Sequence, residues 1–149
     1  MLLPLEVSGK LYEIEEDMMN DNKNIYFILE SENKVRNSIG IEKSGFLMIR
    51  CKNGKPEMLL GTPTYNTSKD VGVRWDKDKP NFSFWDKSQD GTMFFHRNPK
   101  NFINEMKNKD FLTLAWKPYQ RTQVALKFDL NSQNWKEEIE QSIQDGCKL

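Results

Sequence analysis

FLMIRCKNGKPEMLL, residues 46–60, is the stretch that decides the fold. It holds two apolar runs, at 46–51 and 58–60, on either side of a Lys-Asn-Gly-Lys turn. Asn53-Gly54 inside that turn is a strong short-range signal for a β-hairpin, because both residues tolerate a positive φ. The stretch therefore predicts two antiparallel strands joined by a tight turn.

Further short strands are expected on both sides of this hairpin, separated by polar or glycine-containing turns. They are predicted at 10–15, 25–29, 71–75, 82–85, 92–96, 111–116 and 122–130. Short strands that follow one another at this spacing favour an antiparallel sandwich or barrel over a parallel α/β sheet.

Two helices are expected beside the strands. Asn98 offers an N-cap and is followed by a proline at the first helical position, which predicts a helix at about 99–108. An apolar residue recurs every four positions from Trp135 to Ile143 and predicts a C-terminal helix at about 132–145. The predicted fold class is mainly β (α+β): an antiparallel β-sandwich-like domain with one inserted and one C-terminal helix.

The length and charge of the chain limit the classes of protein to which it can belong. The 149 residues match the usual size of one domain, so we expect residues 1–149 to form a single domain. The net charge is zero, although residues 1–46 carry −4 and residues 47–121 carry +6. A neutral chain has no global field that attracts nucleic acid. No apolar run approaches the roughly 20 residues of a membrane helix, so no span is expected.

Catalytic and cofactor-binding patterns are not found in the sequence. His96 is the single histidine, which excludes a multi-histidine metal site and leaves one candidate general base. The glycines are scattered singly at turns, so no phosphate-binding loop is expected. We therefore expect no cofactor and no enzyme activity. An enzyme that uses His96 with a nearby carboxylate is the weakest of the alternatives.

Cations and aromatic residues interleave between Arg74 and Arg121, a pattern that suits binding. Guanidinium or ammonium groups beside indole rings grip carbohydrate, peptide or single-stranded nucleic acid in many proteins. The structural alternative is that the tryptophans anchor the core while the cations face water. Cys51 and Cys147 also leave two readings open, as two buried thiols or as one disulfide that closes a long loop.

The order of several short motifs carries a resemblance that none of them carries alone. They are DMMNDNKNIYFILE (17–30), LMIRC (47–51), VGVRWD (71–76), WDKS (85–88), QDG (89–91), TMFF (92–95), PY (118–119), FDL (128–130) and a helix before Cys147. Together they resemble the VasI (TagO) family of type VI secretion-associated proteins over about residues 10–148. The chain departs from that family at Leu11-Tyr12, where the family has a tryptophan, and it shows no lipobox.

The resemblance implies a non-catalytic accessory or binding domain of the bacterial cell envelope. It further implies a disulfide between Cys51 and Cys147, a protein or cell-envelope partner, and a periplasmic location if a leader has been removed. The polar positions that match the family, and that we therefore predict to bind, are Arg50, Arg74, Asp76, Trp85, Ser88 and Asp90. The alternative is a cytoplasmic phage or mobile-element protein that binds a host protein or nucleic acid, because no leader is visible and the middle is basic.

Overall fold

The predicted hairpin forms, as strands β3 (Glu42–Lys52) and β4 (Lys55–Gly61) of the computed structural model. Asn53 and Gly54 take the two positive φ angles, 52° and 83°, that a two-residue hairpin turn requires. The structure describes residues 12–19 and 21–149. Residues 10 and 11 of the predicted strand at 10–15 lie outside the described residues, and so does residue 20 of the motif at 17–30.

Eight more strands and two helices complete the described chain. The strands are β1 (Tyr12–Glu16), β2 (Lys23–Arg36), β5 (Asp70–Trp75), β6 (Asn81–Phe84), β7 (Asp86–Lys87), β8 (Met93–Phe95), β9 (Phe111–Trp116) and β10 (Val124–Asp129). The helices are α2 (Pro99–Met106) and α3 (Trp135–Gln144).

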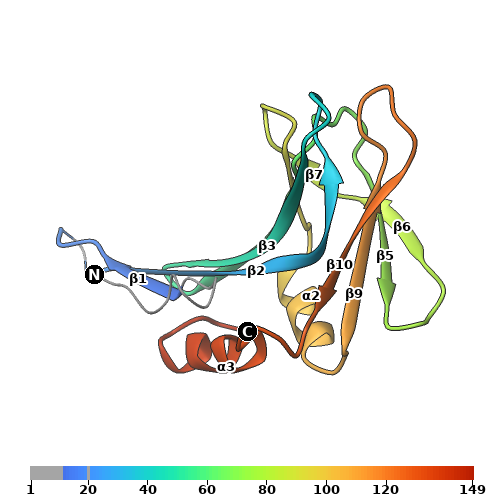
Figure 1. Ribbon diagram of the computed structural model, residues 1–149. Coiled ribbons are helices and arrows are strands. Elements are labelled where there is room, and N and C mark those ends of the chain that lie inside the picture. The colour runs from blue at the N-terminus through green and yellow to red at the C-terminus, as the bar shows by residue number, and fades with distance from the viewer. Residues whose placement is uncertain (1–11, 20) are drawn as a thin grey trace.

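The strands form two antiparallel sheets that enclose one hydrophobic core (Figure 1). Sheet A has six strands in the order β1-β2-β3-β4-β8-β7, and sheet B has four in the order β10-β9-β5-β6. Helix α3 lies under the long arm of sheet A that β1 and β2 form, and α2 lies near the base of the two sheets (Figure 1). The predicted mainly β fold class, with one internal and one C-terminal helix, is confirmed.

Both helices are shorter than the sequence predicts. Helix α2 ends at Met106 rather than near residue 108, and α3 runs over 135–144 rather than 132–145. The hydroxyl of Ser132, where the predicted helix would begin, donates to the carbonyl of Asp129, and Asn134 precedes α3 with a positive φ of 56°. Residues 132–134, which the sequence predicts to be helical, therefore belong to the turn that follows β10.

Strand β2 bends where the two sheets meet. Its register on β3 shifts between Glu30 and Lys34, and Gly45 lies opposite this bulge. A Cβ on Gly45 would collide with Leu126 of β10 and with the carbonyl oxygen of Gly61, so only glycine lets β10 pack so closely here. The Ser31 hydroxyl accepts a hydrogen bond from the Gly45 amide at 3.0 Å, which holds the bulge in place.

Side-chain amides join the bulged part of β2 to β10 of sheet B and to the turn that follows β10. The Asn33 amide donates to the carbonyl of Ala125 at 2.9 Å, and its Oδ1 accepts the amide of Lys127 at 2.8 Å. The Gln133 side chain makes the same two kinds of bond with the backbone of Glu30. These amides replace strand pairing at a place where the bulge prevents it.

A buried polar network fixes the loop that leaves β4. Asn66 is fully buried, and its amide donates to Thr62 Oγ1 and to the Gly91 carbonyl, both at 2.9 Å. The Thr64 hydroxyl donates to Asn66 and accepts the indole N–H of Trp116 at 2.9 Å. Since buried polar groups are costly unless they are bonded, this network fixes one conformation of the loop between the sheets.

Candidate functional site

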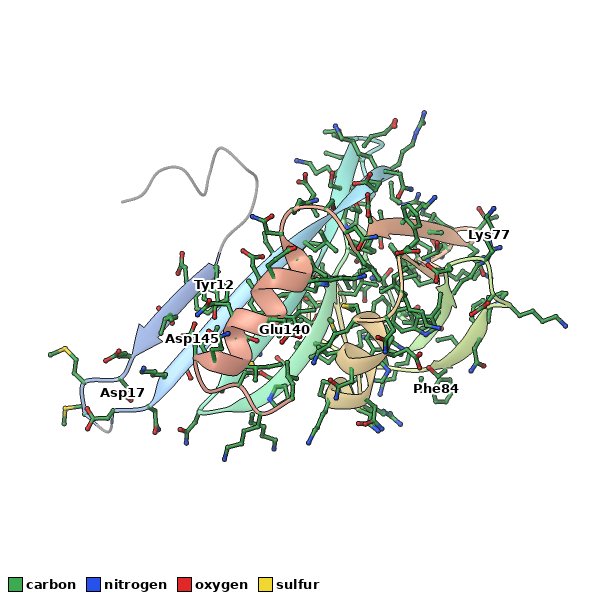
Figure 2. All side chains as sticks on the ribbon, turned by 90° about the horizontal axis from the view of Figure 1, so that it is seen from below. Tyr12, Asp17, Lys77, Phe84, Glu140 and Asp145 are labelled. Carbon is green, nitrogen blue, oxygen red and sulfur yellow. A yellow bond between two sulfur atoms is a disulfide. The ribbon has the colours of Figure 1, made fainter. Side chains whose placement is uncertain are left out.

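A disulfide joins Cys51 on β3 to Cys147 after α3, across 96 residues of sequence. Both cysteines are buried. Beside the bridge, the amide of Lys148 donates to the carbonyl of Gly54, and the Tyr12 hydroxyl donates to Asp145 at 2.6 Å. Figure 2 shows Tyr12 and Asp145 lying together, where β1 passes the end of α3. The disulfide and these bonds clamp the C-terminal segment to sheet A.

Burial and the bond to Asp145 hold the pKa of the Tyr12 hydroxyl well above its usual range. Tyr12 therefore stays protonated and keeps donating at any physiological pH. On the outer face of sheet A, the hydroxyl of Tyr26 is bonded to Glu13, which raises the pKa of Tyr26 to about 12. Neither phenol is available as a base near neutral pH.

Arg50, the first predicted binding residue, lies on the outer face of sheet A. Its Nε donates to Glu57 on the neighbouring strand at 2.8 Å. Arg50 and Glu57 occupy directly opposite register positions on β3 and β4, which brings their side chains together. Arg50 and Glu57 thus form a partly exposed ion pair between two strands of sheet A.

Arg74 and Asp76 lie at the end of β5, on sheet B, where they share one hollow. Arg74 Nε donates to the Asp78 carbonyl at 2.9 Å, and Asp76 accepts the amides of Asp110 and Phe111 at 2.9 and 2.8 Å. Those amide bonds hold the pKa of the Asp76 carboxyl below its usual range. Arg74 and Asp76 share a face but each bonds a backbone segment: Arg74 bonds the turn at 77–78, and Asp76 bonds the start of β9.

Trp85 lies in the core with no exposed surface. Its ring meets His96 at 77° and Phe102 at 82°, with centroids 4.9 and 5.5 Å away. Its indole N–H has no hydrogen-bond acceptor among the described residues. Trp85 therefore packs against His96 and Phe102 from within the core and presents no surface to a partner.

Ser88 and Asp90 shape the turn between β7 and β8. The carboxylate of Asp90 accepts bonds from the Ser88 hydroxyl at 2.7 Å and from the Thr92 amide and hydroxyl. The Ser88 hydroxyl in turn accepts the amide of Met93 at 3.0 Å. The bonds from Ser88 and Thr92 hold the pKa of the Asp90 carboxyl below its usual range.

The six predicted binding residues thus do not form one cluster. The structure brings Arg74 and Asp76 together and Ser88 and Asp90 together, whereas Arg50 and Trp85 lie elsewhere on sheet A and in the core. Within residues 12–19 and 21–149, no group of three or more His, Cys, Asp or Glu side chains is placed to hold a metal ion. No helix in that part of the chain is long and apolar enough to cross a membrane.

The outer face of sheet B carries a trough that the sequence analysis missed. Its floor is one row of small residues on neighbouring strands, Gly72, Ala115 and Ala125. The Phe82 ring lies over Gly72, where a Cβ would collide with it. This hollow, of about 340 Å³, shares Arg74 and Thr113 with the 720 Å³ hollow at Asp76, so the two form one outer trough.

Partly exposed aromatic rings border the outer trough. Phe82 on β6 is 51% exposed and Phe111 on β9 is 36% exposed, and both line the trough. Phe84, which is 62% exposed, lies farther along β6 and is not among the residues that line it. The Lys127 ammonium lies 4.4 Å from the centre of the Phe111 ring. Figure 2 shows Phe84 and Lys77 on the side of the molecule away from α3. Ala115 and Ala125, which stand at outward positions of two predicted strands, were the sequence signal for this surface.

No known family model matches the chain, and no curated protein sequence matches it. Among solved structures, the fold is similar to the crystal structure of invasion associated protein b from Bartonella henselae, with a TM-score of 0.55. That match covers 91% of this chain and 99% of the other at 14% sequence identity. At such identity the likeness concerns the fold alone. The chain therefore has the two-sheet fold of that protein, with a disulfide of the kind that extracytoplasmic compartments maintain.

Proposed function

We propose that this chain is a non-catalytic binding domain of the bacterial cell envelope, which works in the periplasm and holds a protein partner on the outer trough. The single observation that carries the proposal is the trough itself. It has a floor of small residues, two exposed phenylalanines, Phe82 and Phe111, on its borders, and no element of the described chain that covers it. The accessory role in type VI secretion that the VasI (TagO) resemblance implies is part of this proposal.

The disulfide supports the location. Disulfides form and persist in oxidising compartments and are rare in the cytosol, where thiols stay reduced. Cys51 and Cys147 lie with their Cα atoms 5.7 Å apart, well within the range of a disulfide. In a cytoplasmic protein, Cys51 and Cys147 would remain two buried thiols. The disulfide therefore favours a periplasmic location over a cytoplasmic one.

The chemistry of the outer trough supports a protein partner. Ala115 and Ala125 let another backbone or a flat side chain approach the sheet closely, beside the Phe82 ring that covers Gly72. Exposed apolar patches that are rimmed by polar groups mark interaction sites on soluble domains. The rim here carries both signs of charge, from Arg74 and Lys127 to Asp76 and Asp110, which suits the mixed surface of a protein rather than the uniform charge of nucleic acid.

A photo-reactive residue placed at Ala115 tests the proposal in cells of the source organism. Crosslinking there should give one discrete protein adduct in the envelope fraction, and a second change, Ala125→Glu, should abolish it. The matched control is the same photo-reactive residue at Ser44, which is partly exposed on the outer face of sheet A. Equal adducts from positions 115 and 44, or an adduct that survives Ala125→Glu, would show that the trough is not the binding surface.

A further inference from the structure

A second hollow lies on the other side of β5 and β6, where the two sheets open. It has a volume of about 360 Å³ and lies between the inner face of sheet B and the segment that contains His96 and α2. We call it the aromatic cleft. Its lining residues are Val73, Trp75, Asp78, Lys79, Asn81, Ser83, His96 and Phe102.

Three rings follow one another along one side of the aromatic cleft. The Phe102 ring lies between Trp75, with centroids 5.0 Å apart, and His96, with centroids 4.5 Å apart. Phe102 is buried, whereas Trp75 and His96 are partly exposed. The buried Trp85 packs nearly perpendicular to Phe102 and His96 from below, so the row of rings is held rigidly.

Polar side chains without partners line the other side. Asn81 and Ser83 are alternate residues of β6, so their amide and hydroxyl point to the same side, about 7 Å apart along the strand. In the part of the chain that the structure describes, the side chains of Asn81, Ser83, Asp78 and Lys79 make no hydrogen bond or ion pair. These donors and acceptors are therefore free to bond a ligand.

The charge of the aromatic cleft is balanced. Asp78 and Lys79 contribute one carboxylate and one ammonium. Nδ1 of His96 accepts the Asn98 amide at 2.8 Å, which leaves the proton of the neutral ring on Nε2. Burial lowers the pKa of His96, so the ring is neutral at pH 7 and acts as a donor rather than a charge. A cleft without net charge does not select phosphate or an anionic lipid.

From this arrangement we propose that the aromatic cleft binds an uncharged saccharide. A pyranose ring has an apolar C–H face, which packs against aromatic rings, and an edge of hydroxyls, which bonds to amides and hydroxyls. The C–H face would pack against the partly exposed rings of Trp75 and His96, which the buried Phe102 ring joins, and the hydroxyls would point toward Asn81 and Ser83. The volume matches the lower range of small-molecule pockets, which corresponds to one sugar ring with part of the next. This site is on the opposite side of sheet B from the outer trough, so the two can be tested separately.

The test is an NMR titration of the full chain labelled with ¹⁵N, using triacetylchitotriose and maltotriose as probes. At least one trisaccharide should shift the Trp75 indole and Asn81 amide signals saturably, with a Kd in the micromolar to millimolar range. The two probes separate an N-acetylglucosamine glycan from a glucose glycan. Asn81→Ala with Ser83→Ala should raise the Kd at least tenfold. Phe84→Ser, an exposed change on the outward side of the same strand, should leave the Kd unchanged.

Several outcomes would overturn the proposal. One is the absence of any shift of the Trp75 and Asn81 signals up to about 10 mM of either sugar, a concentration that detects even millimolar binding. Another is an unchanged Kd in the Asn81 and Ser83 double variant, which folds because both positions are exposed. A third is a response to inorganic phosphate or trialanine in place of the sugars. None of these results would bear on the outer trough, whose own test uses Ala115 and Ala125.

Discussion

The side-chain oxygen of Asn33 accepts the backbone amide of Lys127 at 2.8 Å, and this bond ties strand β2 of one sheet to strand β10 of the other. The same side chain donates to the carbonyl of Ala125, two residues before Lys127, at 2.9 Å. One side chain thus makes both bonds of a strand pair, at the bulge where β2 itself cannot pair regularly. The Asn33 amide thus joins β2 to β10 directly, while Gln133 bonds the same bulge from the turn after β10.

Asn33→Ala should therefore lower the free energy of unfolding by about 1–2 kcal/mol, the usual value of two partly solvated hydrogen bonds. Urea unfolding followed by tryptophan fluorescence measures the change. Glu32→Ala, on the adjacent exposed residue, is the control and should stay within about 0.5 kcal/mol of the wild type. A loss no larger than that of Glu32→Ala would mean that the two sheets are held together without Asn33.

Reduction of the bridge between Cys51 and Cys147 should cost much of the stability of the domain. In the chain-entropy model, a loop of about 100 residues gains roughly 4–5 kcal/mol from its cross-link. The urea midpoint should fall sharply when a reductant is added to the wild type. The variant with serine at both positions should be equally unstable with or without reductant. Intact mass after alkylation of non-reduced protein from the periplasm and from the cytosol shows in which compartment the bridge forms.

If the wild type kept its urea midpoint after full reduction, the C-terminal clamp would rest on other contacts. Those are the bond between Tyr12 and Asp145 and the packing of Trp135 against Phe27. Tyr12→Phe would then identify the contribution of the first of them. It removes the hydroxyl and leaves the ring stacked on Phe27.

Thr64→Val should destabilise the domain through the indole of Trp116. Valine has nearly the shape of threonine, but it leaves the buried Trp116 N–H without its acceptor. An unsatisfied buried donor costs about 1–3 kcal/mol. A double-mutant cycle with Trp116→Phe, measured by urea unfolding, isolates this bond because phenylalanine has no N–H to satisfy. Strictly additive effects of the two changes would show that the bond does not contribute to stability.

Asp76 should make the domain acid-sensitive. Its folded pKa lies below the usual value because its carboxylate accepts the amides of Phe111 and Asp110. Below about pH 4 the unfolded chain therefore binds more protons than the folded chain, and stability is lost as the pH falls through the folded pKa. Asp76→Asn should lower stability at pH 7 and flatten this acid limb in urea unfolding measured from pH 7 to pH 2.5.

Asp78→Asn is the matched control for the acid limb. Its carboxylate accepts no hydrogen bond within the described residues, so its removal should leave the pH dependence of the urea midpoint unchanged. An acid limb in Asp76→Asn as steep as that of the wild type would assign the acid sensitivity to other carboxylates. Asp90, which three bonds from Ser88 and Thr92 hold in its turn, would be the next residue to change.

The sequence was sufficient for the local elements. Asn53-Gly54 between two apolar runs predicts its hairpin because the turn depends only on its own residues. The strand at 111–116 was likewise predicted at its observed bounds. The second half of β2 was missed, because its bulge leaves Ser31 and Val35 buried without a regular alternation. The burial pattern there is set by β10, far along the chain.

The candidate sites were less accessible from the sequence, because they depend on which segments meet in space. Asp76 bonds the backbone amide of Asp110, far along the chain, and Arg74 bonds the backbone carbonyl of Asp78 nearby. Every residue has such backbone groups, so the sequence does not show which of them will be the partners. Trp85 could equally have been an exposed binding residue or a core anchor, and only its neighbours His96 and Phe102 decide for the core. The implied binding role of the six positions remains a prediction.

The clamp between Cys51 and Cys147 also has a consequence for biogenesis. Cys51 lies on β3, whereas its partner is made 96 residues later, after strand β10, which closes the sandwich. Until residues 124–147 have left the ribosome, β2 lacks its partner across the bulge and the core lacks one wall. A chain that has been made only up to β9 therefore lacks both the bridge and the wall of the core that β10 supplies, so the domain completes its fold only once both are present.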